Sequence, residues 1–310
     1  MVLTVTLNAA IDKRYVVENY QVGEVNRVKE CAFVAGGKGL NVSKTARIAG
    51  ADVLATGFVG GHAGAYIIEA VEKQDVKTDF IQVKGESRSC INIYDSVNKT
   101  QTEFLEPGVV VSEEEQRAFY LKFGELIEKC DVVAMSGSVP KGVGTDMYPR
   151  LVQMAKTAGK KVIVDTSGAL LDEVVKAKPN MIKPNIDEIR LLTGKPILDR
   201  EELIEAGMEL QKSGIERVVI SLGADGSLMF VDEGVYQAIV PRIDAVNTVG
   251  CGDCMTAGFA IGFEKGMAPE EALRFASATS AASAMREETG YFVKEDMKAL
   301  FNKIEIKKLK

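Results

Sequence analysis

The stretch that most constrains the chain is Asn247-Thr248-Val249-Gly250-Cys251-Gly252-Asp253. Its glycines permit a tight turn, and the small and apolar residues at 254–260 contain no proline, so a helix is predicted to begin here. The first N–H groups of a helix have no partner within it, and the macrodipole adds about half a positive charge at that end. The turn therefore predicts an anion site built from the backbone of Gly250, Cys251 and Gly252, and phosphate is a suitable occupant.

Asp253 has the wrong charge for a site that only binds phosphate. A carboxylate would repel the anion unless its role is to accept a proton from a nucleophile that attacks the phosphate. The alternative is an ordinary turn in which an aspartate caps a helix. These residues alone do not separate the two interpretations, so the rest of the chain must decide.

Composition and charge limit the class of protein. The 310 residues are 46% hydrophobic and 26% charged, with no low-complexity tract, which is typical of an ordered globular chain. Residues 1–7 lack a basic leader and no run of eighteen apolar residues occurs, so we expect a cytoplasmic protein without a membrane partner. The net charge of −6 argues against a nucleic-acid partner.

The five cysteines are odd in number and scattered, which predicts free thiols rather than a disulfide framework. Cys251 and Cys254 have the spacing of a redox pair or half of a zinc site. No second pair exists, and His62 is the only histidine, so zinc or redox chemistry is the weaker interpretation.

Short apolar strands alternate with helices through most of the chain. Strands are predicted at 2–7, 53–58, 132–136, 161–165, 180–182 and 217–221, with helices in the connections, as in a parallel sheet covered on both faces. Two β-prone hairpins, 14–20 with 29–34 and 89–96 with 102–106, interrupt this alternation. They predict a small separate sheet that covers the site.

Several polar residues are predicted near strand ends, where ligands of open α/β sheets bind. Asp12 follows the first strand, Lys38 and Asn41 belong to a glycine-rich helix start with Gly37, and Arg88 enters the second hairpin. Each has an ordinary alternative: a solvated loop acid, a turn with a surface lysine, or an exposed arginine. The chain has neither a Walker A loop nor a dinucleotide-binding fingerprint.

Two further patterns indicate a nucleotide and its metal. Asn185 and Glu188 lie three apart at a predicted helix start, a spacing suited to hydrated Mg²⁺, although an N-cap Asn with a Glu at N3 explains it equally well. Gly223 and Gly226 follow the strand at 217–221 and permit backbone contact with a nucleotide, or form a hairpin turn.

Through these motifs, the chain resembles the PfkB, or ribokinase-like, carbohydrate kinase family over essentially its whole length. Residues 36–42 and 247–253 are similar to the two family signatures in content, order and separation. Residues 7–12, 23–27 and 136–140 resemble the branch that phosphorylates ketohexose phosphates. The resemblance implies one α/β kinase domain, a three-layer α/β/α sandwich with a mostly parallel sheet, over residues 1–310. It also implies a β lid formed by 13–34 and 87–107 that serves as a homodimer clasp.

The resemblance also implies ATP, Mg²⁺ and roles for individual residues. Asp253 would be the base, with Gly250, Cys251 and Gly252 as the anion hole. The expected acceptor-binding residues are Asp12, Arg27, Gly37, Lys38, Asn41 and Arg88. The expected ATP-binding residues are Lys183, Asn185, Glu188, Ser221, Gly223, Gly226 and Ser277, of which Asn185 and Glu188 would serve the metal. Cys251 stands where the family usually has Ala or Ser, Ala9 where this branch commonly has Pro, and Ser277 where many relatives have Asn.

The acceptor is expected to carry a phosphate already. A chain of net charge −6 does not attract sugar phosphates in general, so a local cluster of Lys38, Arg88 and Arg27 must supply the recognition. Fructose 1-phosphate, giving fructose 1,6-bisphosphate, is favoured as the substrate of the broader group, and tagatose 6-phosphate is the alternative. A sugar- or nucleotide-binding regulator is the non-enzyme alternative, and a nicotinamide-dependent oxidoreductase is disfavoured by the missing fingerprint.

Overall fold

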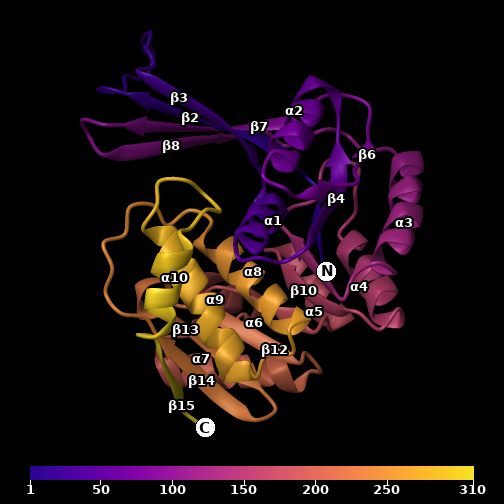
Figure 1. Ribbon diagram of the computed structural model, residues 1–310, viewed down its shortest axis with the longest axis vertical. Coiled ribbons are helices and arrows are strands. Elements are labelled where there is room, and N and C mark those ends of the chain that lie inside the picture. Colours follow the sequence, from indigo (N-terminus) through magenta and orange to yellow (C-terminus); the bar gives the residue numbers. More distant parts are fainter.

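A mixed central sheet organises the chain in the computed structural model, which describes residues 1–310 (Figure 1). Its middle strands run parallel and comprise β1 (Val2–Thr6), β4 (Val53–Val59), β9 (Val132–Ser136), β10 (Lys161–Asp165), β11 (Met181–Ile182) and β12 (Arg217–Ser221). The short strands β5 (Lys77–Thr78) and β6 (Ile81–Gln82) pair with β4 at one edge. The strand order is β12-β11-β10-β9-β1-β4, so the chain reverses its direction of winding next to β1.

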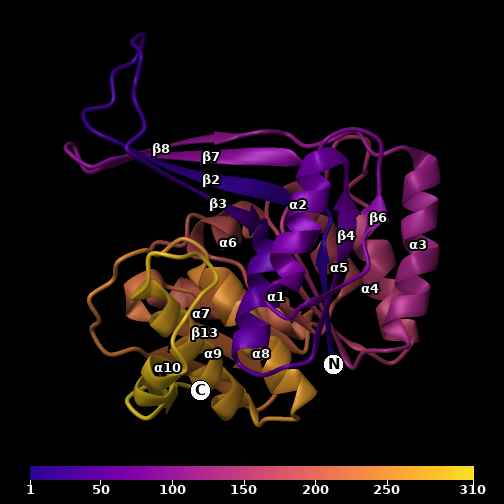
Figure 2. The same ribbon diagram turned by 45° about the horizontal axis from the view of Figure 1, so that its top comes forward.

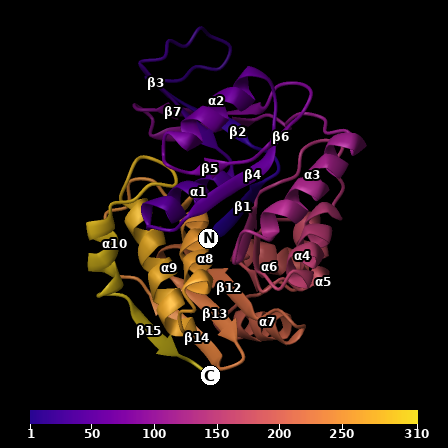
Figure 3. The same ribbon diagram turned by 45° about the vertical axis from the view of Figure 1, so that its right-hand side comes forward.

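Helices cover both faces of this sheet (Figure 3). The buried residues of one face pack against α1 (Lys38–Ile48), α2 (Gly61–Glu72), α8 (Cys251–Glu264), α9 (Pro269–Ala284) and α10 (Lys294–Phe301). Those of the other face pack against α3 (Glu113–Ile127), α4 (Met147–Thr157), α5 (Ala169–Ala177), α6 (Ile186–Thr193) and α7 (Arg200–Lys212). The predicted three-layer α/β/α sandwich is therefore confirmed.

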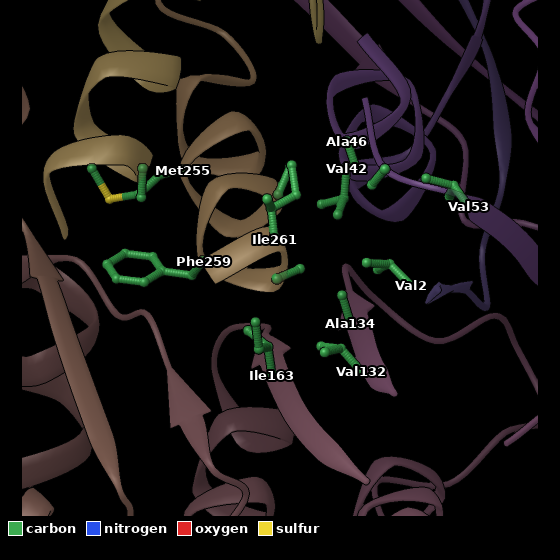
Figure 4. Packing of buried hydrophobic residues seen from close by; sticks show 14 of the residues in the cluster. Val2, Val42, Ala46, Val53, Val132, Ala134, Ile163, Met255, Phe259 and Ile261 are labelled. Carbon is green, nitrogen blue, oxygen red and sulfur yellow. The ribbon is translucent and has the colours of Figure 1, made fainter. Parts of the chain in front are cut away.

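Alternate residues of each central strand enter the two cores, as the period of two in a strand requires. Val132 and Ala134 of β9 lie on the α8 side (Figure 4), whereas Val133 and Met135 lie on the α3 side. Because both faces are covered, these strands are buried on both sides and mostly apolar, with a few buried polar residues such as Thr4 and Thr6 of β1.

The far edge of the sheet is antiparallel and was not predicted. β13 (Ser227–Val231) pairs antiparallel with β12, β14 (Gly234–Ile239) with β13, and β15 (Glu305–Lys308) with β14. The connection between β12 and β13 is the short 3₁₀ turn Gly223–Asp225, so the hairpin interpretation of this glycine pair describes its backbone correctly. None of the helices is long and apolar enough to span a membrane.

A second sheet projects from the side of the molecule (Figure 2). It contains β2 (Ala10–Val17), β3 (Glu30–Gly36), β7 (Arg88–Asp95) and β8 (Thr100–Leu105), in the order β3-β2-β7-β8. The two antiparallel hairpins meet through parallel pairing of β2 with β7. Asp12 follows the first strand, as expected, but it is a residue of β2, so its alternative interpretation as a solvated loop acid is wrong.

Helix α8 is buried around most of its circumference, and small residues make this possible. An ideal Cβ on Gly258 would lie 2.5 Å from the Cα of Ala276, and one on Gly262 would lie 2.9 Å from the Cβ of Ala272. The axes of α8 and α9 therefore approach more closely than larger side chains allow. This packing holds the N-terminus of α8 in the centre of the molecule.

The close approach predicts an unusual cost for adding one methyl group. Gly258→Ala forces the new Cβ against the backbone of α9 and should destabilise the protein by about 1–3 kcal/mol in urea unfolding. Gly124→Ala is the matched control, because a Cβ there meets only Met154 Cε at 3.9 Å within α3. Gly124→Ala should stabilise the protein by about 0.5–1 kcal/mol through helix propensity. Equal effects of the two substitutions would contradict the packing argument.

Candidate active site

The first turn of α8 lies beside the carboxyl ends of the parallel strands. Gly250 caps the helix in the left-handed conformation (φ 79°), and an added Cβ would lie 2.5 Å from Thr289 Cγ2, so a side chain does not fit. The N–H groups of Gly250, Gly252 and Asp253 have no acceptor within the chain, whereas that of Cys251 donates to the Thr248 carbonyl oxygen at 3.3 Å. Three free donors thus converge at a helix start that favours anions.

Asp253 is almost completely buried in this turn, with 5% of its surface exposed. Asn41 Nδ2 donates a 2.8 Å hydrogen bond to its Oδ2. Burial, and next the charge of Asp165, raise the pKa of Asp253 to about 6, while Asn41, Lys38 and Lys183 oppose the shift. The carboxylate is therefore ionised at neutral pH yet close enough in pKa to accept a proton during a reaction.

Asp165 was missed by the sequence analysis. It is the last residue of β10 and is 2% exposed. Its carboxylate forms ion pairs with Lys183 Nζ at 3.2 Å and Lys38 Nζ at 3.7 Å, and accepts a hydrogen bond from Thr256 Oγ1 at 3.3 Å. Although burial acts in the opposite direction, the lysines Lys183 and Lys38 hold the pKa of Asp165 below its usual value. An aspartate at the end of a predicted apolar strand was the signal that could have found it.

Lys38 and Lys183 place two cations beside the α8 N-terminus. Lys183 is buried, and its Nζ would lie 3.1 Å from a Cβ on Gly252, so it borders the turn directly. Lys38 begins α1 after Gly37, whose φ of 106° suits glycine, and its side chain is 44% exposed. Lys38 can therefore reach outward to a ligand while Lys183 stays in place.

Asp12 and Arg88 lie where the second sheet joins the central one. The Asp12 carboxyl packs against Gly36, where any Cβ would lie 2.1 Å from it, and burial raises its pKa against the charges of Lys44 and Arg88. Arg88 Nε donates to the Asn8 carbonyl oxygen and its Nη1 to that of Glu106, both at 3.1 Å. Arg88 is thus part of the join as well as a cation near Asp12.

Arg27 is not brought together with these residues. It is exposed on the loop between β2 and β3, which extends away from the core (Figure 2). Lys38, Asn41, Asp253, Asp165 and Lys183 form one cluster, with Asp12 and Arg88 at its second-sheet side.

Asn185 and Glu188 form a reciprocal capping box at the start of α6. Asn185 Oδ1 accepts from the Glu188 N–H and Glu188 Oε2 accepts from the Asn185 N–H, each at 2.9 Å. The capping alternative is therefore what the structure contains, and no cluster of three His, Cys, Asp or Glu side chains is present to hold a metal. Glu188 keeps Oε1 without a partner, which fits Mg²⁺ held by one carboxylate together with the phosphate oxygens of a nucleotide.

The other residues expected to bind ATP differ in how accessible they are to a ligand. Ser221 ends β12 beside Asn185, and Gly226 has a φ of 87° and would place a Cβ 2.0 Å from the Ala238 carbonyl oxygen. The turn they border is open to solvent. Ser277 is 1% exposed within α9, and its hydroxyl has no hydrogen-bond partner. Ser277 is therefore a packed helix residue in this structure rather than an accessible contact.

Comparisons with known proteins identify the family of the chain. Residues 5–296 match the family model of the pfkB family carbohydrate kinases. The chain belongs to the PfkB family. A tagatose-6-phosphate kinase from Staphylococcus epidermidis is 39% identical over 99% of both chains. As a PfkB carbohydrate kinase, the protein is a phosphotransferase with an alcohol group as acceptor.

Solved structures of PfkB proteins superpose closely on the chain. A possible 1-phosphofructokinase from Thermotoga maritima has a TM-score of 0.90 at 30% identity and covers 100% of each chain. Phosphofructokinase-2 from Escherichia coli, solved in complex with potassium, has a TM-score of 0.91 at 25% identity, covering 97% of this chain and 98% of its own.

The thiols of this PfkB chain do not have the character of a redox or metal pair. Burial raises the pKa of Cys251 to about 12 and also raises that of Cys254. Both thiols are therefore protonated at neutral pH, which opposes metal binding and nucleophilic reactivity.

The buried Lys183–Asp165 ion pair gives a prediction about stability. Lys183→Met leaves a buried carboxylate with one cation fewer and should destabilise the protein by on the order of 3 kcal/mol at pH 7.5, measured by urea unfolding. Because the pKa of Asp165 is lowered in the folded protein, its ion pair contributes folding stability at pH values above its unfolded-state pKa. The loss of unfolding free energy in Lys183→Met should therefore become smaller at acid pH, where Asp165 of the variant is protonated. Lys161→Met is the control, because its pair with Glu216 is roughly 40% exposed and worth at most about 1 kcal/mol. Similar losses in both variants would contradict the prediction.

Proposed function

We propose that the protein transfers the γ-phosphoryl group of ATP, with Mg²⁺, to a ketohexose phosphate and releases a bisphosphate and ADP. The observation that carries this proposal is the position of Asp253. A buried carboxylate with a raised pKa lies in the same helix turn as three free N–H donors, between Lys38 and Lys183. This combination supports proton removal from an alcohol next to a phosphoryl group.

In the proposed reaction Asp253 orients the acceptor hydroxyl and takes its proton as the oxygen attacks the γ-phosphorus. The new O–P bond forms as the bond to the β-phosphate oxygen breaks, and its electron pair leaves with ADP. The N–H groups of Gly250, Gly252 and Asp253, with Lys183, stabilise the charge on the transferring group. Mg²⁺ bound near Glu188 and Asn185 would neutralise phosphate charge.

The remaining expected residues divide between the two substrates. Asp12 and Asn41 have the acceptor and donor groups that suit sugar hydroxyls, and Gly37 and Lys38 border them. The turn bearing Gly223 and Gly226, with Ser221 and Lys183, is proposed for ATP.

Replacing the base tests this assignment. Asp253→Asn should lower kcat by at least 10²-fold while ATP binding remains measurable by calorimetry. In the wild type, kcat should fall as the pH drops below about 6, because protonated Asp253 cannot accept a proton. The variant should also be more stable at pH 7.5, since a carboxylate whose folded-state pKa is raised costs stability above that pKa. Near-wild-type turnover in Asp253→Asn would refute the role of base.

Two acceptors fit the proposal. The 39% identical relative supports tagatose 6-phosphate, and the 30% identical structure supports fructose 1-phosphate, which the sequence analysis favours. Fructose 1-phosphate would present its 6-hydroxyl to Asp253, and tagatose 6-phosphate its 1-hydroxyl. Either sugar carries the phosphate that Lys38 and Arg88 are proposed to recognise.

A substrate panel separates these acceptors and tests phosphate recognition. In a coupled assay of ADP release, the better of the two sugar phosphates should exceed unphosphorylated fructose by at least about 10²-fold in kcat/KM, as expected for a charged group bound by cations. Arg88→Ala should raise the KM for the sugar phosphate more than that for fructose. If it weakened both equally, Arg88 would hold the sheet join and not the phosphate.

We also propose that the second sheet is a lid and that it pairs with the lid of a second copy. Its edge strands β3 and β8 are unpaired on their outer sides. Large apolar side chains are exposed on both faces of the sheet, because the neighbouring residues Phe33 and Val34, and likewise Phe104 and Leu105, point to opposite faces and are all exposed. Such a sheet has apolar faces and edges that need a cover. Arg27 on the projecting loop would then face the partner.

Light scattering tests this dimer. The wild type should be dimeric at micromolar concentration, and Phe104→Lys should shift it toward the monomer because a charge would be buried at the interface. Leu121→Lys on α3 is the control, since Leu121 is 74% exposed and outside the lid. A monomeric wild type would refute the clasp.

A further inference from the structure

Lys44 is a buried lysine to which the proposed reaction gives no role. It lies in α1 with 5% of its surface exposed. Its ammonium donates to two backbone carbonyl oxygens, those of Ala35 at 3.1 Å and Thr289 at 3.4 Å. Burial lowers the pKa of Lys44, and the charges of Asp12, Asp253 and Glu288 oppose that shift.

The two carbonyl groups belong to different halves of the site. Ala35 lies near the end of β3 and precedes Gly36, whose backbone packs against the Asp12 carboxyl. Thr289 lies in the loop after α9, and its methyl group occupies the space beside Gly250 where no Cβ fits. The Lys44 ammonium therefore holds the end of β3, which packs against Asp12, and also the loop residue Thr289, which packs against Gly250 in the turn before α8.

Neighbouring contacts fix the same loop. Thr45 Oγ1 donates to the Gly290 carbonyl oxygen at 3.0 Å, and Asn247 Nδ2 donates to that of Glu287 at 2.8 Å. The Glu287 side chain pairs with Arg14 of β2 at 3.3 Å. The loop at 286–290 thus contacts the second sheet, α1 and the turn before α8, and Figure 1 shows it rising from α10 toward the second sheet.

We propose that Lys44 is a positioning residue that fixes the acceptor side of the site relative to the phosphate side by holding the Ala35 and Thr289 carbonyl groups. This inference rests on the proposed function, because it takes Asp12 as an acceptor contact and the Gly250 turn as the anion hole. Lys44 touches neither substrate in this arrangement. The charge of Lys44 also favours the ionised form of Asp12.

Stability alone does not explain a lysine at this position. Removing an ammonium from water is costly, and two neutral carbonyl groups compensate less than a close carboxylate does. Methionine has a similar length and would fill the same space without that cost. A positioning role therefore predicts that Lys44→Met lowers activity without lowering stability, whereas a structural role predicts that both fall.

The experiment compares Lys44→Met with Lys44→Arg, Thr45→Val and the exposed control Lys73→Met in the full chain. Steady-state kcat and KM are measured for ATP and for the better sugar phosphate, together with the melting temperature. In Lys44→Met we expect the sugar-phosphate KM to rise at least fivefold and kcat to fall at least tenfold. The KM for ATP should stay within about twofold, and the melting temperature should be equal or higher. Lys44→Arg should recover most of kcat, and Thr45→Val should lower kcat without changing the sugar KM.

Several results would overturn the inference. Wild-type kcat and KM in Lys44→Met would do so, as would a loss of activity that matches a loss of folded protein. If Lys44→Met does not fold, Lys44→Gln, which keeps a donor without the charge, replaces it under the same criteria. Asp253→Asn run in parallel separates the two proposals. An inactive Asp253→Asn with a normal Lys44→Met refutes only the positioning role, whereas an active Asp253→Asn refutes the proposed base.

Discussion

The burial of α8 against α9 is the constraint on which the rest of the molecule depends. A helix enclosed on most sides can reach the centre of an α/β sandwich only if its neighbours approach closely, and Gly258 and Gly262 provide that approach. Once α8 is fixed, its first turns lie beside Asp165 at the end of β10 and Lys183 just after β11. Three free N–H groups and a carboxylate of raised pKa are then positioned together by the packing of one helix.

The electrostatics of the site follow from how its charges share this enclosed space. Asp165 and Asp253 repel each other, and the two lysines favour the ionised form of both. Asp165 has the closer lysine contacts and stays ionised. The repulsion between the two carboxylates therefore disfavours the ionised form of Asp253, and the pKa of Asp253 rises. Asp165 thereby adjusts the proton affinity of its neighbour although the proposed reaction assigns it no contact with substrate.

Much of the fold could be predicted because apolar strands and amphipathic helices alternate from residue 112 onward. The capping box at Ser112 and the helix starts at Lys38 and Cys251 were read correctly from local chemistry. Strand β15 was missed because its pairing with β14 joins residues 236–239 to residues 305–308, far apart in the chain. Strands β13 and β14 form local hairpins, and they were missed although the glycine pair at 223 and 226 indicated a hairpin turn. The roles of Asp165 and Lys44 escaped notice because their partners are also distant in the chain. Those partners come from β3, α1, the residue after β11, α8 and the loop after α9.

The short connection between the two sheets has a mechanical consequence. Only residues 7–9 separate β1 from β2, so Asp12 is carried by a strand that leaves the central sheet almost at once. Asp253, in contrast, is anchored in the rigid interior. A rotation of the second sheet would act as a lever that changes the separation of these two carboxylates. If Asp12 contacts the acceptor as proposed, the free energy of orienting that sheet becomes part of the acceptor's affinity and not of the nucleotide's.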